Sequence, residues 1–139
     1  MSPSVPGLGG RREAREEALS FLYETELTGD PAIEGIASRD IPLEDYAVAM
    51  VEGVDADRAE LDEIIGRNLT GWTIHRMAVV DRVIARMAAW ELRSRPDVPT
   101  GAVLSEAVEL ATQYSGEDSP RFLNGVLRSV ANELRPDEA

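Results

Sequence analysis

The sequence contains no cysteine and only one histidine, His75. Without cysteine the chain can form no disulfide, no thiolate metal site and no thiol nucleophile, and the absence is compatible with a reducing cytosol. A lone imidazole cannot supply the paired ligands of a histidine metal site, so His75 is interpreted as solvated or as a capping residue. These absences favour a cytoplasmic protein without a bound metal.

Long apolar runs are also missing, because no uninterrupted apolar stretch reaches the length of a membrane-spanning helix. The first ten residues are neutral and rich in glycine and proline, whereas a secretory leader joins positive charge to an apolar stretch. We therefore expect a soluble protein with no membrane partner. Residues 1–10 are expected to form a flexible arm.

The familiar motifs of catalysis and phosphate binding do not occur. The Gly-x-Ser-x-Gly pattern is absent, and Gly7, Gly9 and Gly10 neither follow a predicted strand nor complete a phosphate-binding loop. The clustered acids around Glu16 and Glu60 are typical of solvated helix faces. The sequence thus predicts no enzyme activity and no cofactor.

Lysine is absent too, since all 14 basic residues are arginine, and 26 acidic residues bring the net charge to −12. An acidic surface opposes non-specific nucleic-acid binding, which needs a positive field. Arginine suits planar, bidentate recognition of phosphates and bases, although a codon bias would also remove lysine. Any nucleic-acid site on this chain must therefore be local.

One local cluster of positive charge is "GRREAR", residues 10–15, which contains Arg11, Arg12 and Arg15. The dipole of a helix disfavours cations at its N-terminus, so helix stability does not explain these arginines. A phosphate bound there would meet both the guanidinium groups and free backbone amides. The alternative is that the arginines pair with Glu16 or Glu17.

Apolar residues recur at helical spacing through most of the chain, and no segment alternates like a strand. The pattern predicts an all-α protein, a compact bundle of about six to seven helices. The long third helix is expected to bend near residues 53–55, and Thr73 is a candidate N-cap. Helices are predicted over residues 11–27, 33–37, 43–69, 77–94, 103–116 and 120–134.

The segment 77–94 is apolar nearly all round and is predicted to be the central helix. Asp81 and Glu91 interrupt its apolar sector, where a carboxylate must be paired or must face a partner. Ala78, Ala85 and Ala89 form a line of small residues to which another helix could pack closely.

The last predicted helix begins with Ser119 as N-cap and Pro120 in the first turn. Phe122 falls at the edge of its apolar stripe, beside Arg121, which suits stacking on an unpaired base. Gly125 lies on the same outer flank. Because glycine costs stability in a helix interior, we expect some group to approach closely there.

Four segments together resemble the bacterial NusB family of transcription antitermination factors: "RREAREEALSFLYETEL", "EDYAVAMVEGV", "LTGWTIHRMAVVDRVIARMAAWEL" and "VLSEAVELATQYSGEDSPRFLNGVL". The resemblance implies a single RNA-binding domain over residues 11–139, with two helical subdomains at about 11–70 and 71–135. It implies no reaction. With the ribosomal protein NusE, such a factor would bind single-stranded boxA RNA of ribosomal RNA operons. The pair would help RNA polymerase to read through terminators.

The resemblance also assigns roles to individual residues. Tyr23 and Asp81 would meet NusE, whereas Glu91 is left without an explanation. The residues implied to contact RNA are Arg11, Arg12, Arg15, Gln113, Tyr114, Asp118, Arg121 and Phe122.

A second hypothesis needs no RNA. The net charge of −12 and the line of alanines in the segment 77–94 also suit an acidic helical adaptor that contacts only proteins, or a homodimer that hides its arginines.

Overall fold

A computed structural model describes residues 9–30, 35–36 and 43–138, and within these ranges every regular element is a helix. The prediction of an all-α fold is therefore confirmed. None of the helices in these ranges is both long and apolar enough to cross a membrane. The helices are α1 (Gly9–Thr28), α3 (Asp45–Ala56), α4 (Arg58–Arg67), α5 (Val79–Ser94), α6 (Thr100–Tyr114) and α7 (Ser119–Leu134), with short 3-10 helices η1 (Ile74–Arg76) and η2 (Pro136–Glu138).

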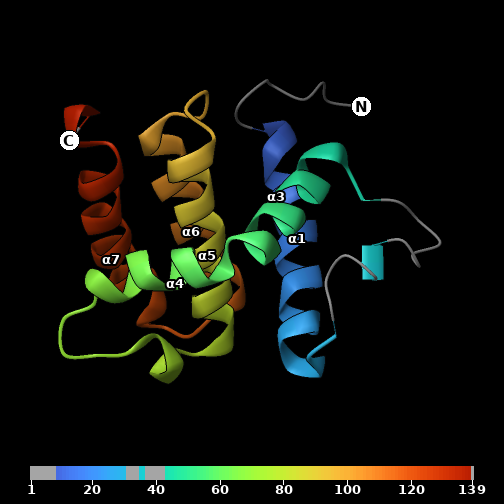
Figure 1. Ribbon diagram of the computed structural model, residues 1–139, viewed down its shortest axis with the longest axis horizontal. Helices are drawn as coiled ribbons and strands as arrows, with labels where there is room; N and C mark the ends of the chain where they lie inside the picture. The colour runs from blue at the N-terminus through green and yellow to red at the C-terminus, as the bar shows by residue number, and fades with distance from the viewer. Residues whose placement is uncertain (1–8, 31–34, 37–42, 139) are drawn as a thin grey trace.

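Helix α5 occupies the centre of the molecule, as the sequence predicted (Figure 1). It contacts α1, α3, α4, α6 and α7. Helices α1 and α3 pack together on one side of it, α6 and α7 pack together on the other, and α4 crosses in front. The two ends of the chain therefore contribute opposite flanks of one bundle.

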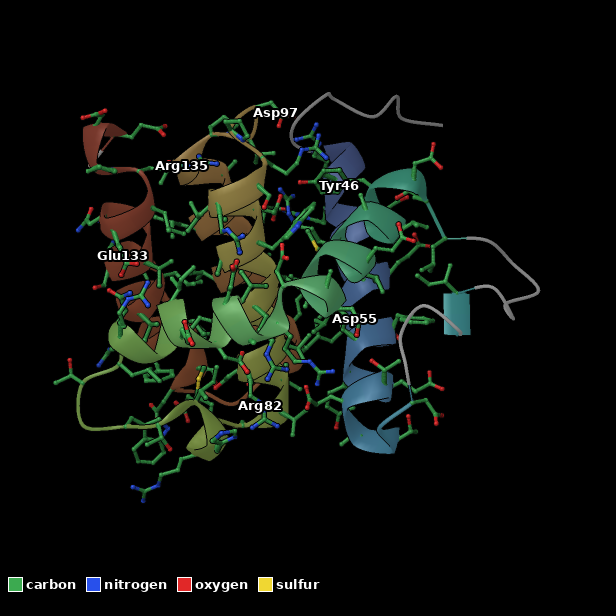
Figure 2. The ribbon with its side chains drawn as sticks, viewed as in Figure 1. Tyr46, Asp55, Arg82, Asp97, Glu133 and Arg135 are labelled. Carbon is green, nitrogen blue, oxygen red and sulfur yellow. The ribbon has the colours of Figure 1, made fainter. Side chains whose placement is uncertain are left out.

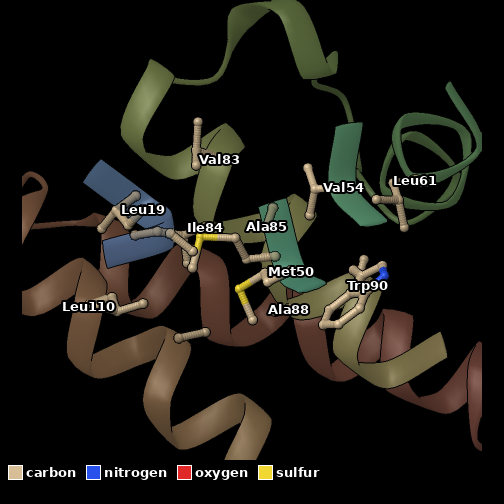
Figure 3. Packing of buried hydrophobic residues seen from close by; sticks show 14 of the residues in the cluster. Leu19, Met50, Val54, Leu61, Val83, Ile84, Ala85, Ala88, Trp90 and Leu110 are labelled. Carbon is tan, nitrogen blue, oxygen red and sulfur yellow. The ribbon is translucent and has the colours of Figure 1, made fainter. Parts of the chain in front are cut away.

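The core is built around the apolar faces of α5, which explains why that helix is apolar nearly all round (Figure 3). Ala85 and Ala89 are completely buried by the chain's own helices, and only Ala78, which precedes α5, is exposed. The prediction that another helix can pack closely on these alanines is met at Ala85 and Ala89 by the chain's own helices, so these two offer no docking surface for a second protein. Their small size instead lets neighbouring helices of the same chain approach closely.

The segment predicted as one bent helix is two helices, α3 and α4, which meet at Asp57. Gly53 does not mark the bend, because α3 continues through it to Ala56. A Cβ atom at Gly53 would lie 2.0 Å from Nε1 of Trp90, so glycine is required there by the indole ring that packs against α3. Gly53 therefore allows the Trp90 side chain of α5 to pack closely against α3.

The predicted helix ends agree with the structure to within three residues, apart from the break at Asp57. Helix α1 ends at Thr28, and Gly29 follows with a φ of +78°, the left-handed conformation common after a helix. Helix α7 begins at Ser119 itself, so Ser119 is not the N-cap. Thr73 precedes η1 without a capping side-chain hydrogen bond. Of the predicted helix 33–37, only residues 35–36 are described, and they are helical; most of the predicted arm lies outside the described residues.

Candidate nucleic-acid interface

Arg15 is not on the surface. Its Nε and Nη2 donate hydrogen bonds to Oε1 and Oε2 of Glu91, and each bond measures 2.8 Å. The side chains of Arg15 and Glu91 are only 2% exposed. Tyr46 donates a third hydrogen bond to Glu91, with 2.6 Å between the oxygens. Although desolvation lowers the pKa of Arg15, the hydrogen bonds and charge of Glu91 raise it above its ordinary value. The prediction that Arg15 contacts RNA is wrong, and Glu91, unexplained by sequence, is its partner.

Arg12 is the accessible arginine of the cluster, with its side chain 52% exposed. It binds Glu106 of α6 through Nε and Nη2, at 3.1 and 2.6 Å, and these hydrogen bonds raise the pKa of Arg12. The Glu106 side chain is only 9% exposed, and its Oε1 also lies 3.6 Å from Nη1 of Arg15. The Glu106 carboxylate thus forms ion pairs with both Arg12 and Arg15.

Arg11 also has partners from distant parts of the chain. Its Nη2 lies 3.2 Å from Oδ2 of Asp97, and its Cζ lies 4.6 Å from the centre of the Tyr46 ring. Tyr46 and Asp97 flank the start of α1 (Figure 2). The alternative, that the arginines pair with Glu16 or Glu17, is wrong about the partners, although each of the three arginines does pair with an acid. The partners come from α5, α6 and the connection between them instead of from Glu16 and Glu17.

The structure brings Gln113 and Tyr114 next to Arg12. Where α1 meets α6, Arg12, Glu16 and Gln113, among others, line a small, closely packed depression in the surface. The exposed Tyr114 donates a hydrogen bond of 2.9 Å to Glu16, and this bond raises the pKa of Tyr114. Tyr114 also lines a second groove, which lies beside Tyr23. That groove is lined by Glu16, Leu19, Ser20, Tyr23, Val80 and Tyr114.

Asp118 and Phe122 belong to a third groove, at the start of α7. The exposed Arg121 lies next to them in sequence, whereas Phe122 is half-buried and packs on the core. Among the described residues nothing lies within 4 Å of a Cβ atom built at Gly125, so the close contact expected there is not found in that part of the chain. The groove is lined by Trp72, Arg76, Met77, Ala78, Asp81, Asp118, Ser119 and Phe122.

Asp81 does not need an outside partner. Its carboxylate is buried and accepts hydrogen bonds from the hydroxyls of Ser115 and Ser119, at 2.5 and 2.8 Å. Ser119 thereby joins the start of α7 to the start of α5. Of the two alternatives, pairing within the chain or facing a partner, the structure shows the first for Asp81, because serines donate to both of its oxygens.

Comparison with known proteins identifies the family of this chain. The sequence profile described as the NusB family matches residues 12–132. The chain belongs to the NusB family. The transcription antitermination protein NusB of Saccharopolyspora erythraea is 42% identical over 130 residues, which cover 89% of this chain and 88% of that protein. The predicted family resemblance and its class, a non-enzymatic transcription antitermination factor, are thus confirmed.

Solved NusB structures share the fold. The NusB of T. maritima superposes with a TM-score of 0.84 at 30% identity, covering 98% of this chain and 97% of that one. A chain from a complex of the antitermination factors NusB and NusE with dsRNA superposes with a TM-score of 0.73 at 28% identity, covering 88% and 96%. In that complex a NusB fold accompanies both a protein and an RNA.

The sequence carried a signal for the burial of Arg15 in this NusB-family chain. Arg15, Leu19 and Leu22 are spaced by four and seven residues, so they share one face of α1, and both leucines are buried. An arginine on the apolar stripe of one helix and Glu91 in the apolar sector of another are complementary. Glu106 gave no such signal, because its role depends on how α6 packs beside α1.

Proposed function

We propose that this NusB-family chain binds single-stranded boxA-type RNA together with NusE, and that it acts in the cytoplasm within an RNA polymerase antitermination complex. The complex would sustain processive transcription of ribosomal RNA operons. The observation that supports the proposal is the hydrogen bond from Tyr114 of α6 to Glu16 of α1, beside the depression that Arg12, Glu16 and Gln113 line. A single strand needs such a combination of cation, amide and exposed ring.

Each side chain on this surface suits a different part of a nucleotide. Arg12 can bind a phosphate with two donors, provided that the phosphate displaces or shares the hydrogen bonds to Glu106. The Tyr114 ring can stack on an unpaired base, and the amide of Gln113 can bind base edges. Arg15 has no part in this contact.

The start of α7 would supply the second half of the RNA site. Arg121 is exposed and can bind a phosphate, and the half-buried Phe122 offers a ring for stacking. The exposed carboxylate of Asp118 would repel phosphate but can accept hydrogen bonds from base amino groups. This half of the site is therefore expected to read bases more than backbone.

NusE is expected to occupy the apolar groove around Tyr23. Tyr23 is exposed there beside Leu19 and Val80, and Tyr114 lies on the border between this groove and the Arg12 surface. A chain with a net charge of −12 attracts a basic ribosomal protein over long range. Bound NusE could thus extend the RNA surface that begins at Arg12.

The alternative function, a protein-only adaptor or homodimer, loses one of its two supports. The alanines that suggested a docking helix are buried inside the bundle at positions 85 and 89. Light scattering with and without RNA tests what is left of it. A dimer that persists unchanged in the presence of RNA would favour the alternative.

The proposal is tested by fluorescence anisotropy with labelled RNA, in the presence and absence of NusE. The RNAs are a boxA-like single strand, a scrambled strand of equal composition, and the boxA-like strand annealed to its complement. We expect NusE to tighten binding of the boxA-like single strand most. Equal affinity for all three RNAs in the presence of NusE would contradict specific single-strand recognition. Arg128→Gln, which removes an exposed arginine elsewhere on α7, is the control for net charge.

A further inference from the structure

Trp72 is a large aromatic side chain held on the surface of the connection between α4 and α5, with 42% of it exposed. The chain's other tryptophan, Trp90, is buried in the core. An indole ring loses favourable burial energy when it stays in water. An exposed position on a fixed loop therefore calls for a role at the surface.

The loop around Trp72 is anchored from both directions. Gly71 has a φ of +66°, which turns the chain immediately before the ring. Ile74 and Met77 are buried directly after it. Arg82, labelled in Figure 2, brings Nη1 to 3.5 Å from the carbonyl oxygens of Ile74 and His75. The exposed ring is thus presented on a fixed backbone, which lowers the entropy cost of binding.

The groove that Trp72 lines combines flat apolar walls with charges of both signs. Phe122 lines the same groove from α7, and the guanidinium of Arg76 lies 4.5 Å from the centre of the Trp72 ring. Both oxygens of Asp81 are engaged by serines, so the exposed Asp118 supplies the available carboxylate. The exposed Arg121 precedes Phe122 in the sequence and adds a second cation to this region.

We infer that this groove is a nucleotide-binding pocket, in which one unpaired base stacks against Trp72 and its phosphate is bound by Arg76. The inference rests on the proposed RNA-binding function and adds Trp72 and Arg76 to its contact residues. A base offers a planar apolar face to the ring, amino donors to Asp118, and an anion to Arg76. An apolar side chain of a protein partner would satisfy the ring alone and would leave both charges unused.

Acrylamide quenching of tryptophan fluorescence tests the contact directly on the whole chain. Trp90 is buried and Trp72 is exposed, so quenching in the free protein comes mainly from Trp72. Trp72→Phe gives the background of Trp90, and the difference between the two proteins isolates Trp72. We expect boxA-like RNA, added with NusE, to protect Trp72 from acrylamide. Protection by NusE alone, with no further effect of RNA, would assign the groove to protein and overturn the inference.

Affinity measurements on variants provide the second readout. Trp72→Ala should weaken RNA binding by about 5- to 150-fold, the range for loss of one base stack, and Trp72→Phe should restore part of it. Arg76→Gln should lower the salt dependence by about one single-strand phosphate contact, a slope change of about 0.7, whereas Arg128→Gln should not. Circular dichroism verifies folding of each variant.

The outcomes separate the inference from the function on which it rests. If the native chain binds RNA by anisotropy while Trp72 stays equally quenchable and Trp72→Ala binds as tightly, the pocket is refuted and the proposed function stands. If the native chain binds no RNA with NusE present, both fail together.

Discussion

Arg15 and Glu91 join α1 to α5 by a buried ion pair in which two parallel hydrogen bonds measure 2.8 Å each. Tyr46 of α3 donates to the same carboxylate, so three helices meet at one polar point inside an apolar bundle. A buried pair of this kind contributes little net stability over apolar residues, but the loss of one partner leaves an uncompensated charge. The pair therefore fixes how α1 sits on α5.

Arg15→Gln should destabilise the fold by about 3–5 kcal/mol, because it leaves Glu91 charged and buried. Urea unfolding measures the free energy. The double variant Arg15→Met with Glu91→Met should recover much of the loss, since neither charge of the pair is left. Arg67→Gln, which breaks an exposed pair with Glu133, is the control and should change little. An Arg15→Gln chain of native stability that no longer binds RNA would contradict the structural role.

Glu106→Gln should tighten RNA binding, by up to about five-fold, because the carboxylate competes with phosphate for the guanidinium of Arg12. Anisotropy with the boxA-like RNA and NusE measures the change. Glu52→Gln, which removes the same charge from an exposed position on α3, is the control for net charge. Weaker RNA binding by Glu106→Gln would show that Glu106 positions Arg12 productively.

Two glycines in helices should respond in opposite directions to alanine. Gly53→Ala should destabilise the fold by about 1–3 kcal/mol or more, because its Cβ atom would overlap the indole ring of Trp90. Gly125→Ala faces open space in the interior of α7 and should stabilise by about 0.5–1 kcal/mol. Thermal or urea unfolding compares the two. Equal effects would mean that helix propensity alone governs both sites.

The helices could be predicted from the sequence because burial of one stripe per helix fixes their period. The central position of α5 could be predicted because its segment is apolar nearly all round. The resemblance also listed Arg12, Gln113 and Tyr114 as RNA contacts, and in the structure Arg12 and Gln113 line one depression while Tyr114 donates to Glu16, one turn from Arg12. These successes depend on local periodicity and on resemblance to a family.

The errors concern groups whose environment is set by other helices. Arg15 looked like one of three equivalent surface arginines, because nothing local in "GRREAR" shows that Glu91 lies opposite it. Gly53 and Gly125 were misjudged for the same reason. A glycine reads alike in sequence whether Trp90 packs against it or only solvent does.

Acid should weaken the contact between α1 and α5 through Glu26. Desolvation raises the pKa of Glu26, but the hydrogen bond and charge of Arg86 lower it more, so the folded-state pKa lies below the ordinary 4.5. The stability contributed by Glu26 is therefore complete above about pH 4.5 and is lost as the pH falls through the folded-state value. Urea midpoints from about pH 7 to pH 3 measure this loss.

Glu26→Gln should flatten that acid dependence below about pH 4.5 and lower stability at neutral pH. Glu24→Gln, an exposed glutamate on the same helix, should leave the native dependence in place. If Glu26→Gln and the native chain lose stability in parallel as the pH falls, the ion pair with Arg86 does not contribute to acid unfolding.

Ultraviolet crosslinking of the chain to boxA-like RNA in the presence of NusE, with the crosslinked residues mapped by mass spectrometry, tests the central claim most directly. The account predicts crosslinks at Tyr114 and Phe122, which border the Arg12 surface and the groove at the start of α7. Crosslinks confined to the groove beside the end of α7, around Leu104 and Arg128, would place the RNA elsewhere and contradict the account.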